Sequence, residues 1–120
     1  MFVSNVLYYS SNHSEAEISV SDGDYTLVCY AHPAERVAIN QIVTELYGFD
    51  CEDIKKADTN DYAVEKITPY FAYQLTAQIV SREKGEVRLG KIHIILDSPI
   101  PGDLCSGDFI SFSVLRLDFG

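Results

Sequence analysis

The chain has 120 residues, of which 47 % are apolar, and its 18 Asp and Glu against 9 Lys and Arg give a formal net charge of −9. This length and apolar content allow one hydrophobic core, so we expect a single folded domain over residues 1–120. The acidity disfavours duplex nucleic acid and anionic membrane surfaces, which select clustered Lys and Arg, and no apolar run approaches the roughly 20 residues of a membrane-spanning helix.

Strands are predicted for the first quarter of the chain. Residues 3–9 are rich in β-branched and aromatic side chains, and residues 16–21 alternate apolar with polar positions, which is the period of a half-buried strand. Residues 21–24 supply turn chemistry, because the glycine accepts positive φ and the Asp side chains bond nearby amides. Residues 25–31 then complete a hairpin.

A helix is predicted over residues 34–47. Pro33 suits a first helical turn, and Gly48 suits the position just past a helix end. The β-branched residues of this stretch lose rotamer freedom in a helix, so a bulged strand is the alternative. The apolar residues that recur at the spacing of one helical stripe are Ile39, Ile42, Val43, Leu46 and Tyr47.

The second half of the chain is predicted to be a meander of strands. Residues 70–79 alternate in polarity, and their odd positions are expected to face the core. Lys84 and Gly85 form a turn, after which residues 86–96 return as a strand with two mixed faces. A last strand follows Gly107 and Asp108.

These elements predict an α+β fold that is predominantly antiparallel β: a small closed or partly open barrel of about 6–7 strands, with the helix at one end. The segment Gly107-Asp108-Phe109-Ile110-Ser111-Phe112-Ser113-Val114 and the position of the helix resemble small OB-type barrels. A β-sandwich is the alternative fold. One fold hosts many functions, so the resemblance assigns no functional residue.

No constellation of residues defines a reaction, a metal site or a cofactor site. Cys29 and His32 are the best metal pair, but no second short-spaced pair accompanies them, and we expect no metal and no cofactor. An acid/base pair could be drawn from Asp50, Glu52 and Asp53, although their position beside lysines favours solvated charge. The chain lacks the glycine-rich and nucleophile motifs of common enzymes, so we expect no catalytic residue.

The acidic residues concentrate at the two ends of the chain. Residues 1–35 hold five acids and no Lys or Arg, and residues 97–120 hold four acids against Arg116, whereas the middle is nearly balanced. Eight tyrosines accompany them, and some are expected on the surface, because Tyr8 and Tyr9 point to opposite faces of a strand and Tyr70 lies opposite an apolar face. Exposed tyrosine beside carboxylates is typical of protein-recognition surfaces.

The preferred hypothesis is a small acidic protein-interaction module, like an immunity protein, antitoxin or inhibitor, that binds a basic partner. The alternatives are an OB-like module for a small ligand, saccharide or single-stranded nucleic acid, and a structural homo-oligomer. Three widely spaced cysteines and a first segment without cations favour a cytoplasmic location. The residues predicted to bind the partner are Tyr8, Tyr9, Glu15, Glu17, Asp22 and Asp24.

Overall fold

The computed structural model describes residues 1–9, 11–67 and 71–119, and within these ranges the chain forms eleven β-strands and no helix. Accordingly, the described residues contain no helix that could cross a membrane. The strands are β1 (Phe2–Tyr8), β2 (Ala16–Ser21), β3 (Thr26–Ala31), β4 (Leu46–Phe49), β5 (Glu52–Lys56), β6 (Ala63–Lys66), β7 (Tyr73–Ser81), β8 (Glu86–Leu89), β9 (Ile92–Leu96), β10 (Phe109–Val114) and β11 (Arg116–Asp118).

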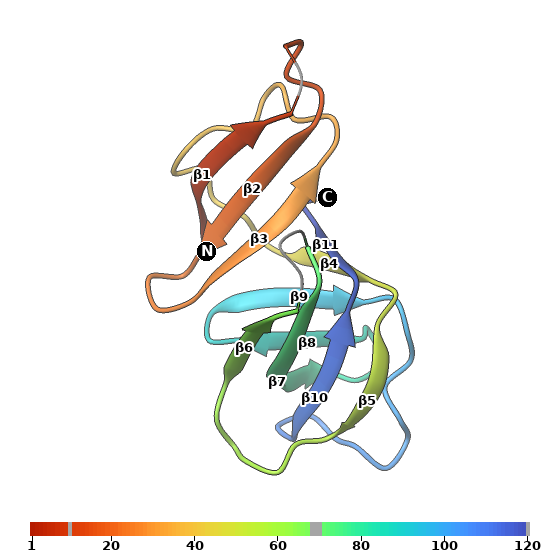
Figure 1. Cartoon of the computed structure of the whole chain (residues 1–120). Coiled ribbons are helices and arrows are strands. Elements are labelled where there is room, and N and C mark those ends of the chain that lie inside the picture. The colour runs from red at the N-terminus through yellow and green to blue at the C-terminus, as the bar shows by residue number, and fades with distance from the viewer. Residues whose placement is uncertain (10, 68–70, 120) are drawn as a thin grey trace.

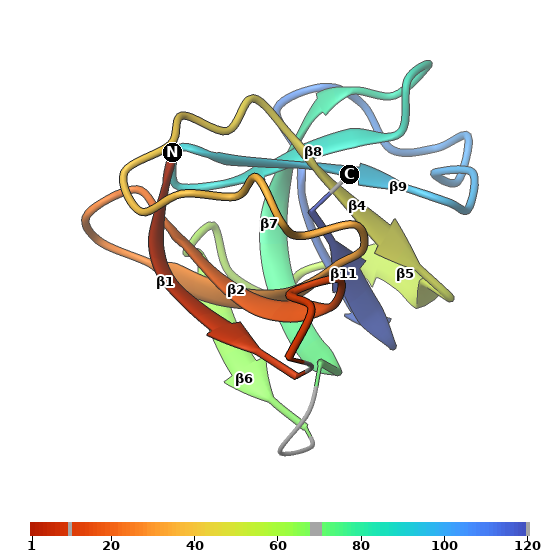
Figure 2. The ribbon, with the colours of Figure 1, turned by 90° about the horizontal axis from the view of Figure 1, so that it is seen from above.

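The strands form one hydrogen-bonded sheet in the order β1-β2-β3-β11-β4-β9-β8-β7-β10-β5, and β6 pairs with β7 beside this path. Strands β1–β3 form one half of an elongated molecule, and β5–β10 form the other (Figure 1). Figure 2 shows the molecule from above, along its length, with β1 and β2 in front. Strands β4 and β11 lie between the halves, where β11 pairs with β3 in parallel and with β4 in antiparallel orientation. The last described strand therefore joins the two halves.

The predicted fold class is wrong: the protein is all-β rather than α+β, and the sheet is not a closed barrel of 6–7 strands. The single sheet also differs from the two stacked sheets of a sandwich. Six of the described strands have five residues or fewer, which is too short for an alternating pattern to stand out in the sequence.

The predicted helix over 34–47 is absent, and most of this segment is an irregular connection between β3 and β4. Its middle runs antiparallel to β1: the Val3 N–H donates to the Gln41 carbonyl at 2.9 Å, and the Val43 N–H donates to the Met1 carbonyl at 3.0 Å. The segment thus covers the outer edge of β1, and its β-branched residues suit this extended backbone.

The predicted hairpin of β2 and β3 is confirmed, with Ile18 opposite Cys29. In its turn, Asp22 accepts hydrogen bonds from the N–H groups of Asp24 and Tyr25 at 2.9 and 2.8 Å, and Gly23 has a φ of +100°. The turn therefore forms as its residue types predict.

The alternation predicted for residues 70–79 is confirmed within β7, because its odd positions from Tyr73 to Ile79 are buried. It is wrong just before the strand, where Ala72 is buried and Phe71 only half-buried. Residues 86–96, however, form two strands rather than one. Gly90, at a φ of +63°, reverses the chain between β8 and β9 and shifts the buried positions from odd to even numbers. This shift explains the two mixed faces in the sequence.

Candidate functional site

Strand pairing places a row of polar and aromatic side chains on one outer face of the sheet. Glu17 lies opposite Tyr30, Tyr30 opposite Asp118, and Asp118 opposite Tyr47, and residues directly opposite each other project from the same face. Arg116 and Phe49 form the next pair of this row. We call this surface the carboxylate–tyrosine face and define it as Glu15, Glu17, Tyr30, Glu45, Tyr47, Phe49, Arg116 and Asp118.

Two tyrosines of the carboxylate–tyrosine face donate hydrogen bonds to carboxylates. The Tyr30 hydroxyl donates to Glu15 Oε1 at 2.5 Å, and the Tyr47 hydroxyl donates to Glu45 Oε1 at 2.8 Å. Each bond favours the neutral phenol, so the pKa of Tyr30 is raised by the bond to Glu15 and the pKa of Tyr47 by the bond to Glu45. These hydroxyls hold the two carboxylates in fixed positions.

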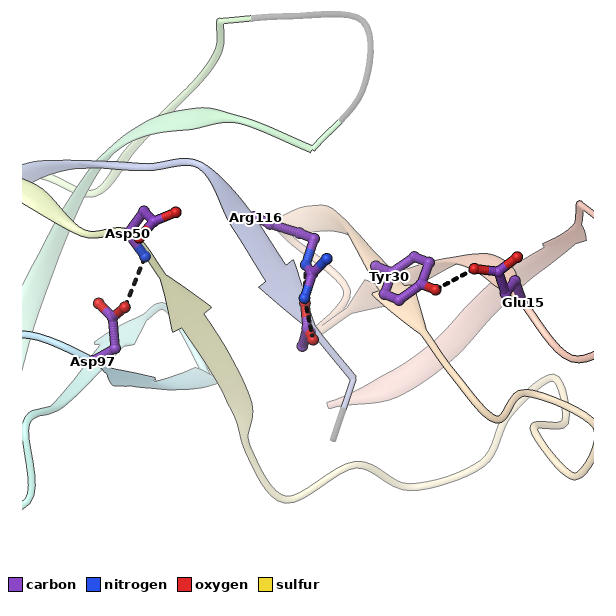
Figure 3. A network of polar contacts seen from close by, with 6 residues as sticks. Glu15, Tyr30, Asp50, Asp97 and Arg116 are labelled. Carbon is purple, nitrogen blue, oxygen red and sulfur yellow. Dashed lines mark hydrogen bonds and ion pairs between the residues drawn. The ribbon is translucent and has the colours of Figure 1, made fainter.

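Arg116 is the cation of the carboxylate–tyrosine face. Its Nε and Nη2 donate to the two carboxylate oxygens of Asp118 at 2.6 and 3.0 Å. The guanidinium carbon lies 4.8 Å from the ring centre of Tyr30 (Figure 3). It also lies 5.6 Å from the ring centre of Phe49. Because Asp118 pairs with Arg116, the charges of Glu15, Glu17 and Glu45 remain in excess on this face.

Three of the six predicted binding residues lie together. The Tyr9 N–H donates to the Glu15 carbonyl at 2.9 Å, which extends the pairing of β1 with β2 and puts Tyr9 on the side of Glu15 and Glu17. Tyr8 projects from the opposite side of β1, and its ring stacks on His13 at 4.0 Å. Tyr70 lies outside the described residues.

Asp22 and Asp24 lie at the other end of β2, roughly 20 Å along the strand from Glu15. Asp22 Oδ2 accepts a hydrogen bond from the Lys91 N–H at 2.7 Å and so joins the β2–β3 turn to the β8–β9 turn. Partial burial opposes ionisation of Asp22, but the N–H groups of Lys91, Tyr25 and Asp24 lower its pKa overall. Asp22 therefore holds the backbone, whereas Asp24 is exposed.

Four residues of the face were not among the binding residues predicted from the sequence: Tyr30, Arg116, Tyr47 and Phe49. Within its strand, Tyr30 alternates with buried Leu27, Cys29 and Ala31, which indicates a side chain on the outer face. No local pattern, however, shows that β11 comes to lie between β3 and β4.

The described residues do not assemble a metal centre, and no group of three or more His, Cys, Asp or Glu could hold an ion there. Cys29 is buried and its thiol donates to the Ile18 carbonyl at 3.3 Å, while exposed His32 contacts the Ser14 carbonyl through Nδ1 at 3.1 Å. Burial raises the pKa of the Cys29 thiol and, for Cys51, raises it to about 12, so neither thiol readily forms a thiolate.

The histidine best placed for acid–base chemistry is His93, whose Nδ1 lies 2.7 Å from Glu86 Oε2. Ser106 lines the same open cavity as His93, but the two residues share no hydrogen bond. The other candidate carboxylates, Asp50, Glu52 and Asp53, are all exposed. These contacts do not complete a nucleophile–base pair.

The OB-like alternative for single-stranded nucleic acid needs a cationic groove lined by tyrosine, and Arg82 and Lys84 are two of the cations that could provide it. These residues line a cavity of about 350 Å³ together with Leu96, Pro99 and Ile100, and the described lining includes no tyrosine. Arg88 instead donates two hydrogen bonds to Gln78 Oε1, at 3.0 and 2.9 Å.

Comparison of the chain with protein-family models, with curated proteins and with solved structures found no match.

Proposed function

We propose that this protein is an interaction module that binds a basic protein surface through the carboxylate–tyrosine face. The observation that carries the proposal is the grouping of Glu15, Glu17 and Glu45 beside two tyrosine rings, where the cation Arg116 is already paired. Aromatic rings supply contact area, and unpaired carboxylates attract a basic partner and select its orientation. A role as an immunity protein, antitoxin or inhibitor fits this chemistry.

We place this function in the cytoplasm. All three cysteines are free thiols, and Cys105 among them is exposed. An exposed thiol persists as a thiol in a reducing compartment, which supports this location.

The proposal is tested by capture of partners from extract of the source cells with immobilised full-length protein. Glu15→Lys with Glu17→Lys reverses two charges on the carboxylate–tyrosine face. Asp58→Lys with Asp61→Lys makes the same charge change in the β5–β6 connection, where both carboxylates are exposed. We expect the first double variant to lose the captured basic proteins and the second to retain them, with amounts measured by quantitative mass spectrometry.

A single variant tests whether the double variant loses its partners only because its fold is disturbed. Glu17 makes no side-chain hydrogen bond in the described structure, so Glu17→Lys leaves the Tyr30–Glu15 contact intact. Glu17→Lys should therefore also lower the amount of captured basic protein. Equal capture by wild type, Glu17→Lys and the double variant would exclude this face as the binding surface.

A further inference from the structure

An apolar pocket of about 320 Å³ lies where β10 continues into β11. We define the apolar pocket by Ile67, Ala72, Val114 and Leu115, with Ser113 and the exposed carboxylates Asp50 and Glu52 also lining it. Its volume is at the lower end of the range for small-molecule sites, which gives room for one large side chain.

Two apolar side chains of the pocket are exposed. The exposed fractions of Ile67 and Leu115 are 54 % and 60 %, and neighbouring Phe49 is 41 % exposed. The Leu115 N–H donates to the Phe49 carbonyl at 3.1 Å, which ties this part of the pocket to β4. Contiguous exposed apolar side chains with a polar rim are typical of interaction sites.

Hydrogen bonds fix the β4–β5 turn, which carries the carboxylates at the pocket. Asp97 accepts hydrogen bonds from the N–H groups of Asp50 at 2.7 Å and Cys51 at 3.1 Å, and from the Ser98 hydroxyl (Figure 3). The Asp50 and Glu52 side chains are therefore presented on a fixed backbone beside the pocket. Lys66, which precedes the pocket residue Ile67, has its ammonium group over the Tyr73 ring, 5.8 Å from the ring centre.

Chain neighbours of two pocket residues lie in or against the carboxylate–tyrosine face. Phe71, which precedes the pocket residue Ala72, packs its ring edge-on against Tyr30 with the ring centres 5.9 Å apart. Arg116, which belongs to the face, directly follows the pocket residue Leu115. These chain connections place the apolar pocket beside the carboxylate–tyrosine face.

We propose that the apolar pocket receives a hydrophobic side chain of a peptide segment whose flanking residues are Lys or Arg. The inference rests on the proposed function and names the recognised chemistry: an apolar anchor in the pocket, and cations beside Asp50, Glu52 and the carboxylate–tyrosine face. Burial of the anchor supplies affinity, and the charges exclude acidic segments.

The test is an NMR titration of the ¹⁵N-labelled full chain at low ionic strength with capped pentapeptides. Lys-Lys-Phe-Lys-Lys should shift the amides of Ile67, Ala72 and Leu115 in a saturable manner. Lys-Lys-Ser-Lys-Lys should bind about tenfold more weakly, because it lacks the apolar anchor. Glu-Glu-Phe-Glu-Glu should not bind, because its charges repel those of the rim.

Variants locate the binding within the molecule. Leu115→Ser should weaken the binding of Lys-Lys-Phe-Lys-Lys by about fivefold and leave the binding of Lys-Lys-Ser-Lys-Lys unchanged. Val80→Ser, at a side chain 37 % exposed outside the pocket, is the matched control and should change neither titration.

The inference is overturned if the three pentapeptides bind equally, if Leu115→Ser has no effect, or if no peptide shifts the pocket amides at millimolar concentration. Shifts around Glu15 and Glu17 with both lysine peptides but none at the pocket would overturn the inference and support the proposed function. Failure of the proposed function is decided separately by the capture experiment.

Discussion

Carboxylates in this protein have two different tasks, and individual hydrogen bonds separate them. Asp22 accepts bonds from backbone N–H groups of two turns and Asp97 from those of one turn, so both carboxylates stabilise turns. Glu15 and Glu45 accept bonds from tyrosine hydroxyls and remain at the surface. The sequence alone treats these residues alike, which is why it grouped Asp22 with the binding residues.

The first prediction concerns pH. Burial opposes ionisation of Asp97, but the N–H groups of Cys51 and Asp50 lower its pKa below the ordinary value of 3.8. The ionised form therefore stabilises the fold at pH values above about 3.8, and this contribution is lost as the pH falls through the lower folded-state pKa. Asp97→Asn should flatten the decline in unfolding free energy at acid pH, as measured by urea unfolding across a pH series.

The control for this pH series is Asp103→Asn, which changes an exposed carboxylate that makes no hydrogen bond in the described structure. The unfolding free energy of Asp103→Asn should decline at acid pH as much as that of the wild type. If the unfolding free energy declines equally at acid pH in the wild type and in Asp97→Asn, then Asp97 does not stabilise the β4–β5 turn through its charge.

A second prediction concerns Gly90. A Cβ atom there would collide with Asp22 Oδ2 and lie 2.9 Å from the Tyr25 ring, and the φ of +63° is unfavourable for other residues. Gly107→Ala is the control, because its φ is +95° but nothing lies within 4 Å of the added atom. Gly90→Ala should lower the unfolding free energy by about 2 kcal/mol more than Gly107→Ala in urea titrations; equal losses would contradict the close contact.

A third prediction concerns Arg116. Lysine cannot reproduce the two-pronged bond to Asp118 or the stacking on Tyr30 and Phe49, so Arg116→Lys should destabilise the protein by about 1 kcal/mol. Arg82→Lys, at an exposed position, should change the unfolding free energy by less than about 0.5 kcal/mol. Equal effects of the two variants in thermal or urea unfolding would rule out a specific role for the guanidinium.

At the scale of elements, the sequence patterns correctly predicted the strands and turns that depend on interactions between residues close together in the chain. The β2–β3 hairpin depends on its own turn residues, and the alternation of β7 directly reflects its buried face. The helix prediction for 34–47 failed because the periodic residues do not share one buried face: Ile39 and Ile42 are 55 % and 75 % exposed, whereas Val43 and Leu46 are buried. Pairing with β1, which lies more than thirty residues earlier, determines this segment instead.

A fourth prediction tests this segment in solution. Phe2 and Ile42 form an antiparallel bridge between the hydrogen bonds of Val3 and Val43, a geometry that brings Hα atoms of facing residues close together. NMR should show a strong nuclear Overhauser effect between the Hα atoms of Phe2 and Ile42. Helical chemical shifts over 34–47 with no such contact would contradict the structure.

At the scale of the whole molecule, long-range pairing determines both the fold and the carboxylate–tyrosine face. Strand β11 pairs with β3 and β4, and β4 pairs with β9 in parallel, so residues from distant parts of the chain share one surface. Tyr9, Glu15 and Glu17 could be grouped from the sequence because they are local neighbours. Arg116 and Tyr47 could not, because only this topology brings them to Tyr30.

A fifth prediction follows from the links between the halves. Strand β11 and the Asp22–Lys91 bond connect β1–β3 to the remainder, so the halves should unfold together. Native-state hydrogen exchange should give the slowest amides of β2 and β7 the same opening free energy. Opening of β2 at a free energy lower by about 2 kcal/mol or more would show that the halves unfold independently.

The most direct test of the interaction account is carboxylate-to-lysine cross-linking of the captured complexes, read by mass spectrometry. A zero-length cross-linker joins a carboxylate only to a partner lysine in contact with it. The account predicts cross-links from the partner to Glu15, Glu17 and Glu45. Cross-links located instead on Asp58, Asp61 and Asp103, or spread evenly over the exposed acids, would contradict it.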